Sequence, residues 1–167
     1  MFLKIVIFTF LFTYLKASDI KLGFKTISIT NNISSYSTGQ KFVPKVIKTL
    51  ENFISTSSDQ KKNHLVISIN RYNVTVKSPN ASKLFNSKKG KLYNHTVDLI
   101  VEVINENKRK LFLEEIRVTS LKFFEMEGGI KNQLKFQELI SDELNLNLIT
   151  KLRKLFMVKI GDYVFPN

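Results

Sequence analysis

Regular alternation of apolar and polar residues predicts three β-strands. In "FKTISIT", at residues 24–30, Ile27 and Ile29 share one face and the residues between them are polar. Residues 92–104 and 111–124 alternate in the same way. Only the short polar segment "NENKRK" separates these last two stretches. The sequence therefore predicts a long antiparallel hairpin there.

A fourth strand is predicted at His64–Lys77, "HLVISINRYNVTVK", with one irregularity. Its apolar residues keep one parity as far as Ile69 and change to the other parity at Tyr72. One extra residue in a strand shifts the parity in this way. We therefore expect a β-bulge near Asn70 and Arg71.

Two stretches have apolar residues at helical spacing. The first covers residues 40–56, with Pro44 in the first turn, where its missing N–H costs little. The second covers residues 130–156. Ser141 and Asn145 interrupt its apolar positions and predict a kink or a new helix start.

The predicted element order is β-α-β-β-β-α, which is typical of the α+β class. We expect a two-layer sandwich in which an antiparallel or mixed four-stranded sheet packs on two helices. The other face of the sheet carries more polar residues, so it is either solvated or covered by a partner. Residues 18–167 are expected to form this single domain.

The most apolar part of the chain is its beginning. Lys4 precedes an apolar run at residues 5–15, and Ala17 and Ser18 follow it. The run is too short for an ordinary membrane-spanning helix, and this order is typical of a secretory signal peptide. We expect a signal peptide at residues 1–17, with cleavage after Ala17 or, alternatively, after Ser18. A buried first strand is the other interpretation, but the run does not alternate.

The absence of cysteine restricts both chemistry and anchoring. Bacterial lipoproteins are cut just before a cysteine that receives the lipid, and Ser18 stands at that place here. No lipid anchor can form at a serine. Small secreted eukaryotic domains usually carry disulfides, so the sequence favours a bacterial protein that is periplasmic or secreted, without a transmembrane helix in the mature chain.

The chain is strongly basic, with 26 Lys and Arg against 14 Asp and Glu and a formal net charge of +12. Such a charge favours an anionic partner, either nucleic acid, a membrane surface or an acidic polysaccharide. Codon composition alone is the other explanation for the many lysines. The candidate contacts for an anionic ligand or partner are Lys88, Lys89, Lys91, Lys108, Arg109 and Lys110. A further basic cluster lies near the end of the second predicted helix, at Lys151, Arg153 and Lys154.

Residues that could support catalysis are few. His64 and His95 stand on separate predicted strands, and each is expected to be a satisfied structural or surface histidine. Adjacent strand residues point to opposite faces, so Glu114 and Glu115 cannot form an acid–base pair. Further candidates have simple structural interpretations: Asp142 and Glu143 on the solvated side of a helix, and Gly128-Gly129 as a chain break without a phosphate-loop lysine. We expect no catalytic residues, metal or cofactor, and therefore no enzyme.

The element order resembles that of the lipopolysaccharide-assembly (LptE-like) lipoprotein group and similar small exported envelope proteins. The segments that carry the resemblance are "FKTISIT", the helix at 40–56, "VDLIVEVINENKRKLFLEEIRVTS" and a last helix ending in "LITKLRKLF". The resemblance implies a non-catalytic protein that binds an outer-membrane or envelope partner, with its basic residues on lipid phosphates.

Three function classes remain. The first is an exported assembly or binding accessory of the envelope, for lipopolysaccharide or an outer-membrane partner. The second is a basic nucleic-acid-binding protein, and an export signal argues against it. The third is a small hydrolase, which no motif supports.

Overall fold

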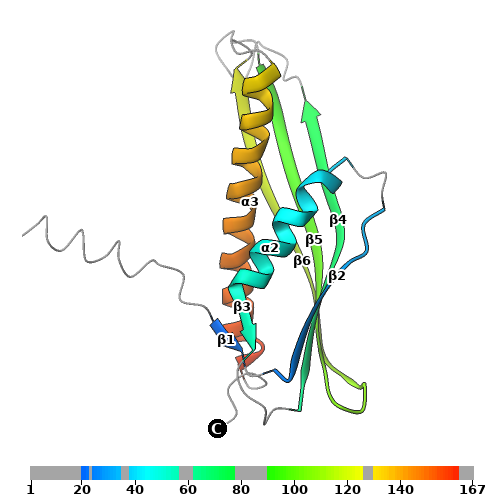
Figure 1. The fold of residues 1–167 in the computed structure, drawn as a ribbon. Coiled ribbons are helices and arrows are strands. Elements are labelled where there is room, and N and C mark those ends of the chain that lie inside the picture. The colour runs from blue at the N-terminus through cyan, green and yellow to red at the C-terminus, as the bar shows by residue number, and fades with distance from the viewer. Residues whose placement is uncertain are drawn as a thin grey trace, which may run out of the picture.

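The computed structural model describes residues 20–22, 24–34, 38–56, 62–77, 90–125 and 130–161. The predicted signal peptide, Ser18, Lys88, Lys89 and Gly128-Gly129 lie outside these residues. In chain order the elements are β1 (Ile20–Leu22), β2 (Thr26–Asn31), the 3₁₀ turn η1 (Gln40–Phe42), α2 (Val43–Phe53), β3 (Ile54–Thr56), β4 (His64–Lys77), β5 (Gly90–Ile104), β6 (Lys110–Glu125) and α3 (Ile130–Val158) (Figure 1).

The main sheet has four strands in the order β2-β4-β5-β6. Strands β4, β5 and β6 are antiparallel neighbours, whereas β2 lies parallel to β4 with Thr26 opposite His64. A parallel pair needs a crossover, and η1 and α2 lie in the connection from β2 to β4. The predicted α+β fold with a mixed four-stranded sheet is therefore confirmed.

The predicted bulge in β4 is also confirmed. Ile69 pairs with Leu99 and Arg71 pairs with Asp98, so Asn70 has no partner in the β5 register. If the same residues alternated without a bulge, Tyr72 would point to the outer face of the sheet. With it, Ile69 and Tyr72 are both completely buried on the inner face.

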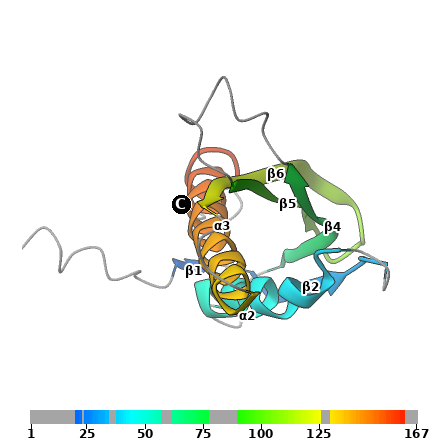
Figure 2. The same cartoon turned by 90° about the horizontal axis from the view of Figure 1, so that it is seen from above.

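Both helices cover the inner face of the sheet. Seen from above, the sheet curves around the core, with α3 along its β6 side and α2 along its β2 side (Figure 2). Leu50 of α2 and Leu148 of α3 are completely buried between the layers, opposite inward-pointing strand residues such as Val101. Each such side chain contributes about 1.5–3 kcal/mol relative to its exposed state. The core thus fixes α3 along the length of the sheet.

The predicted helix at 40–56 is partly wrong. The segment starts as a 3₁₀ turn, becomes α-helical at Val43 and ends at Phe53. Ile54 has an extended backbone, with φ −113° and ψ 112°, and β3 then pairs in parallel with β1, Ile20 opposite Ile54. The β-branched Ile54 and the serines and threonine after it favour extended over helical backbone. This small second sheet was not predicted.

Helix α3 is longer and more regular than predicted. It runs without interruption through Ser141 and Asn145 and continues to Val158. Ser141 and Asn145 are buried against the sheet, so they continue the inward face of the helix and start no new one. The prediction of a kink or restart is therefore wrong.

The turn between β5 and β6 is held by its first residue. The side-chain oxygen of Asn105 accepts a hydrogen bond from the Arg109 backbone amide at 2.9 Å. The backbone carbonyl of Asn105 accepts one from the Lys108 backbone amide, also at 2.9 Å. Lys108 has a left-handed backbone, with φ 59°. Lys108 and Arg109 are therefore presented at the tip of the hairpin, both exposed.

Candidate functional site

The structure separates the predicted basic residues. Lys91 is the second residue of β5. Lys108, Arg109 and Lys110 lie beyond the other end of the same strand. Strand geometry of about 3.3 Å per residue puts roughly 45 Å between these two places. Lys91 therefore cannot contact one small ligand together with the hairpin residues.

The hairpin tip is only partly neutralised. Lys110 forms an ion pair with Glu102, and Lys25 pairs with Glu106 at 3.3 Å. Lys108 and Arg109 form no ion pair with any residue that the structure describes. The tip therefore presents to solvent two cations that have no carboxylate partner among the described residues.

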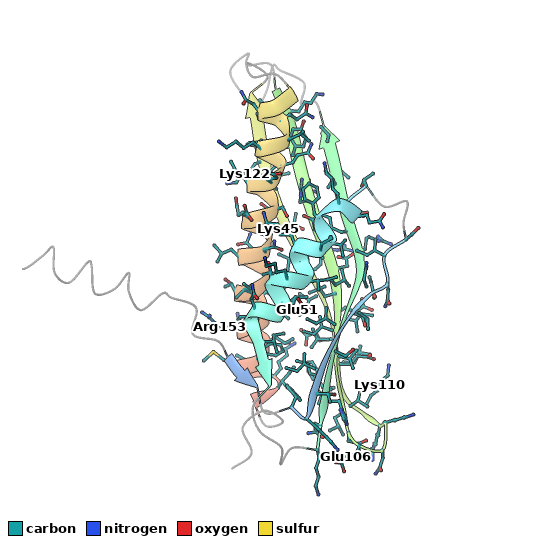
Figure 3. The ribbon with its side chains drawn as sticks, viewed as in Figure 1. Lys45, Glu51, Glu106, Lys110, Lys122 and Arg153 are labelled. Atoms are coloured by element: carbon teal, nitrogen blue, oxygen red, sulfur yellow. The ribbon has the colours of Figure 1, made fainter. Side chains whose placement is uncertain are left out.

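A second group of cations lies at the same end of the molecule. The β5–β6 turn and the C-terminal end of α3 lie at one end in Figure 1, and Figure 3 shows Lys110 and Arg153 in that half. We call this the basic end, with its cations defined as Lys108, Arg109, Lys110, Lys151, Arg153, Lys154 and Lys159.

The cations of α3 are held in different ways. Lys151 donates to the backbone carbonyl of Arg117 at 2.9 Å, and Lys159 pairs with both oxygens of Glu114, at 2.8 and 2.6 Å. The guanidinium of Arg153 lies 5.9 Å from the ring centre of Phe53. Several of these charges are thus anchored while they stay exposed.

A groove of about 220 Å³ lies between α3 and β6 at the basic end. Ile116 and Leu155 supply a buried apolar floor, while Val158 is exposed. The polar part of its lining consists of Lys151, Lys154, Lys159 and Glu114. An apolar floor with a mainly cationic rim is suited to a group that is both apolar and anionic.

The outer face of the sheet carries a second, polar hollow of about 470 Å³ beside the β4 bulge. Arg117 binds Asp98 through two hydrogen bonds of 2.7 and 3.0 Å. Arg71 and Glu115 also line the hollow. Positive and negative groups are balanced in this hollow, so it has no excess of positive charge.

A cluster of polar side chains is buried between the sheet and α3. The Tyr72 hydroxyl lies 3.1 Å from Nδ1 of His95 and donates to the Ser141 hydroxyl at 3.5 Å. Other polar atoms of the cluster have no hydrogen-bond partner among the described residues. They are Nε2 of His95, Oγ of Ser120, and both side-chain amide atoms of Asn145. The sequence prediction of a satisfied His95 is thus right for only one ring nitrogen.

Burial keeps this cluster neutral. Desolvation, and then the nearby charge of Lys41, lower the pKa of His95 to about 4. Desolvation raises the pKa of Tyr72 to about 12, against the opposing effect of its hydrogen bond to Ser141. Because His95 and Tyr72 have no exposed surface, neither can touch a substrate in this conformation.

The remaining candidates have structural roles. Nδ1 of His64 lies 2.6 Å from the Thr26 hydroxyl and links β4 to β2. Glu114 faces α3 and Glu115 lines the outer hollow, so the two carboxylates lie on opposite faces, as predicted. Within the described ranges, no three His, Cys, Asp or Glu side chains gather where a metal could bind. The acidic pair on α3 bridges to its neighbours, Asp142 to Lys45 and Glu143 to Lys122.

Sequence reasoning missed the buried cluster and the groove, although part of the signal was visible. His95 shares the parity of Val97, and Ser141 and Asn145 occupy apolar positions of the helix. Together these positions predict polar groups facing each other across the core. The groove has no sequence signal, because it depends on how α3 lies along the edge strand β6.

Comparison with known proteins gives fold similarity alone. The sequence matches no family model and no curated protein. The structure is similar to lipoprotein B from Nitrosomonas europaea, with a TM-score of 0.51, 11% identity, and coverage of 89% of this chain and 92% of that one. It is also similar to a homolog of a neuraminyllactose-binding hemagglutinin from Helicobacter pylori, with a TM-score of 0.53, 11% identity and the same coverage.

In the described part of the chain, no helix has both the length and the apolar character needed to cross a bilayer. The predicted resemblance to LptE-like and other small envelope lipoproteins is confirmed as a likeness of fold. The chain thus shares an α+β architecture with structurally known bacterial lipoproteins.

Proposed function

We propose that this protein is an exported, non-catalytic accessory of a bacterial cell envelope that binds an envelope partner through its basic end. The observation that carries the proposal is the fold match to lipoprotein B over 89% of the chain. The predicted signal peptide at residues 1–17 supports export to the periplasm or beyond, and the domain at 18–167 is the exported part.

The charge distribution supports an anionic partner. Lys108 and Arg109 project from the hairpin tip without a carboxylate partner in the described chain, and Lys154 lies exposed at the end of α3. The partner classes that fit are an outer-membrane or envelope protein with an acidic surface and an anionic lipid or polysaccharide. The basic nucleic-acid-binding alternative is supported by net charge alone.

The polar groups of the core support a role without catalysis. Among the described residues, His95 and Tyr72 have the largest pKa changes, and both are buried away from solvent. A perturbed pair in an open cleft would favour an enzyme, whereas this pair connects β4, β5 and α3 inside the core.

The experiment is isolation of the tagged protein from its native host after chemical cross-linking. We expect it in the envelope fraction, with an intact mass showing cleavage near Ala17, and cross-linked to an outer-membrane protein or an anionic glycolipid. The variant Lys108→Glu with Arg109→Glu should lose the cross-link, whereas Lys135→Glu on the other half of α3 should keep it. Recovery of the uncleaved chain in the cytosol with bound nucleic acid would refute the proposal.

A further inference from the structure

The last turn of α3 exposes two apolar side chains in a basic environment. Met157 and Val158 have 69% and 71% of their surface exposed, the two highest exposures among the large hydrophobic residues described. Lys154 precedes them by three and four positions, so it lies beside both on the helix surface. We call this patch the helix tip, with Lys151, Lys154, Met157, Val158 and Lys159 as its residues.

The apolar pair has no counterpart within the described chain that could cover it. The sheet and α2 lie on the other side of α3, where Leu148, Leu152 and Phe156 are buried. Val158 instead borders the groove, whose other lining residues include three lysines and one carboxylate. Two exposed apolar groups surrounded by an excess of cations therefore form the outermost part of α3.

We infer that the helix tip docks on the surface of an anionic phospholipid bilayer. Shallow binding of this kind places apolar side chains at the acyl boundary and cations at the level of the phosphates. The long lysine stems allow their amines to reach that level while the stems stay in contact with apolar surface. Each cation near an anionic bilayer strengthens binding. The helix tip has three lysines and faces one carboxylate, Glu114, which pairs with Lys159, so a net charge of two cations remains.

The position of the helix tip in the molecule supports a planar partner. It lies at one end of an elongated fold, together with the hairpin tip (Figure 1). A planar surface that meets this end of the fold can therefore contact the helix tip and the cations of the hairpin tip, Lys108 and Arg109, at the same time.

The docking of the helix tip rests on the proposed envelope function but can be tested separately. The chain contains no tryptophan, so Met157→Trp places a single fluorescent reporter in the helix tip. Vesicles of phosphatidylcholine alone are compared with vesicles of equal parts phosphatidylcholine and phosphatidylglycerol. We expect a blue shift of the emission only with the anionic vesicles. The matched reporter Leu146→Trp, also on an exposed position of α3, should not shift.

Binding strength is then measured by co-sedimentation of variants with the anionic vesicles. Met157→Ser with Val158→Ser should weaken binding about tenfold or more, and so should Lys154→Glu. The matched controls Leu146→Ser and Lys135→Glu should stay within about twofold of the unmodified chain. All of these positions are exposed on α3, and circular dichroism verifies that each variant keeps its fold.

Three results would overturn the inference: equal shifts of the two reporters, equal binding to neutral vesicles, or helix-tip variants that bind as well as their controls. Binding of duplex DNA with the same dependence on Lys154, in the absence of vesicle binding, would also overturn it. If vesicle binding fails while the cross-link to an envelope partner persists, only the membrane docking is wrong and the proposed function stands.

Discussion

Burial of His95 should make the stability of this protein fall in mild acid. The residue has no exposed surface, lies 4.9 Å from the ring centre of Phe42, and has only one ring nitrogen near a hydrogen-bond partner. Its pKa is lowered from 6.5 to about 4 by desolvation and by the charge of Lys41. Protonating it in the folded state therefore means burying a charge without a counterion in the described chain.

The sign and size follow from the two pKa values. Between pH 6.5 and pH 4 the unfolded chain binds a proton at His95 that the folded chain does not bind, so stability rises with pH across this window. The contribution is fully present above pH 6.5 and is lost as the pH falls toward 4. A difference of 2.5 in pKa corresponds to a loss of about 3 kcal/mol.

The assay is urea denaturation followed by circular dichroism, at pH 7 and at pH 4. Because carboxylates titrate in the same range, the informative quantity is the difference in unfolding free energy between the unmodified chain and His95→Gln. This difference should change by about 3 kcal/mol in favour of the variant on acidification. Leu148→Ala, a destabilised core variant without a titrating change, should show no such shift. A difference that does not depend on pH would refute the reasoning.

Three further predictions concern stability and use the same denaturation assay at neutral pH. Gly39→Ala should cost more than about 2 kcal/mol, because a methyl group there would lie 2.4 Å from the backbone oxygen of Tyr72; unchanged stability would show that this contact relaxes freely. Lys108→Gly should stabilise the fold by about 0.5–1 kcal/mol, since φ is 59° at this position, and a loss of stability would contradict the left-handed turn. Leu50→Ala should cost about 2–5 kcal/mol because Leu50 is completely buried, and a cost below 1 kcal/mol would mean that α2 is not part of the core.

The sequence predicted the secondary structure well where every second side chain of a strand, or one face of a helix, is buried. Alternation predicted the bounds of β4 at His64–Lys77, and the change of parity predicted its bulge at Asn70, because inward positions must be apolar. The strands β1 and β3 have three residues each, too few to show a period. Their pairing depends on where α2 ends, and apolar spacing does not determine that residue.

The candidate site was predictable in chemistry and not in position. The basic clusters could be read directly, but Lys91 and Lys108 belong to opposite ends of one strand. Lys154 joins Lys108 at the basic end only because α3 returns along the sheet. The apolar half of the helix tip was missed. The periodic apolar face of the helix ends at Phe156, and the next two side chains, Met157 and Val158, do not continue it.

The mixed pairing of the sheet also determines the order in which it can assemble. Strands β5 and β6 are joined by residues 105–109, so closing their hairpin costs little chain entropy. Strand β2 reaches its parallel partner only after a longer loop closes, which pairs Thr26 with His64. Contacts that are distant in sequence form late, so we expect the hairpin to fold first and β2 to dock last. Amide hydrogens of β2 should accordingly exchange with solvent before those of β5, through a partial unfolding that leaves the hairpin intact.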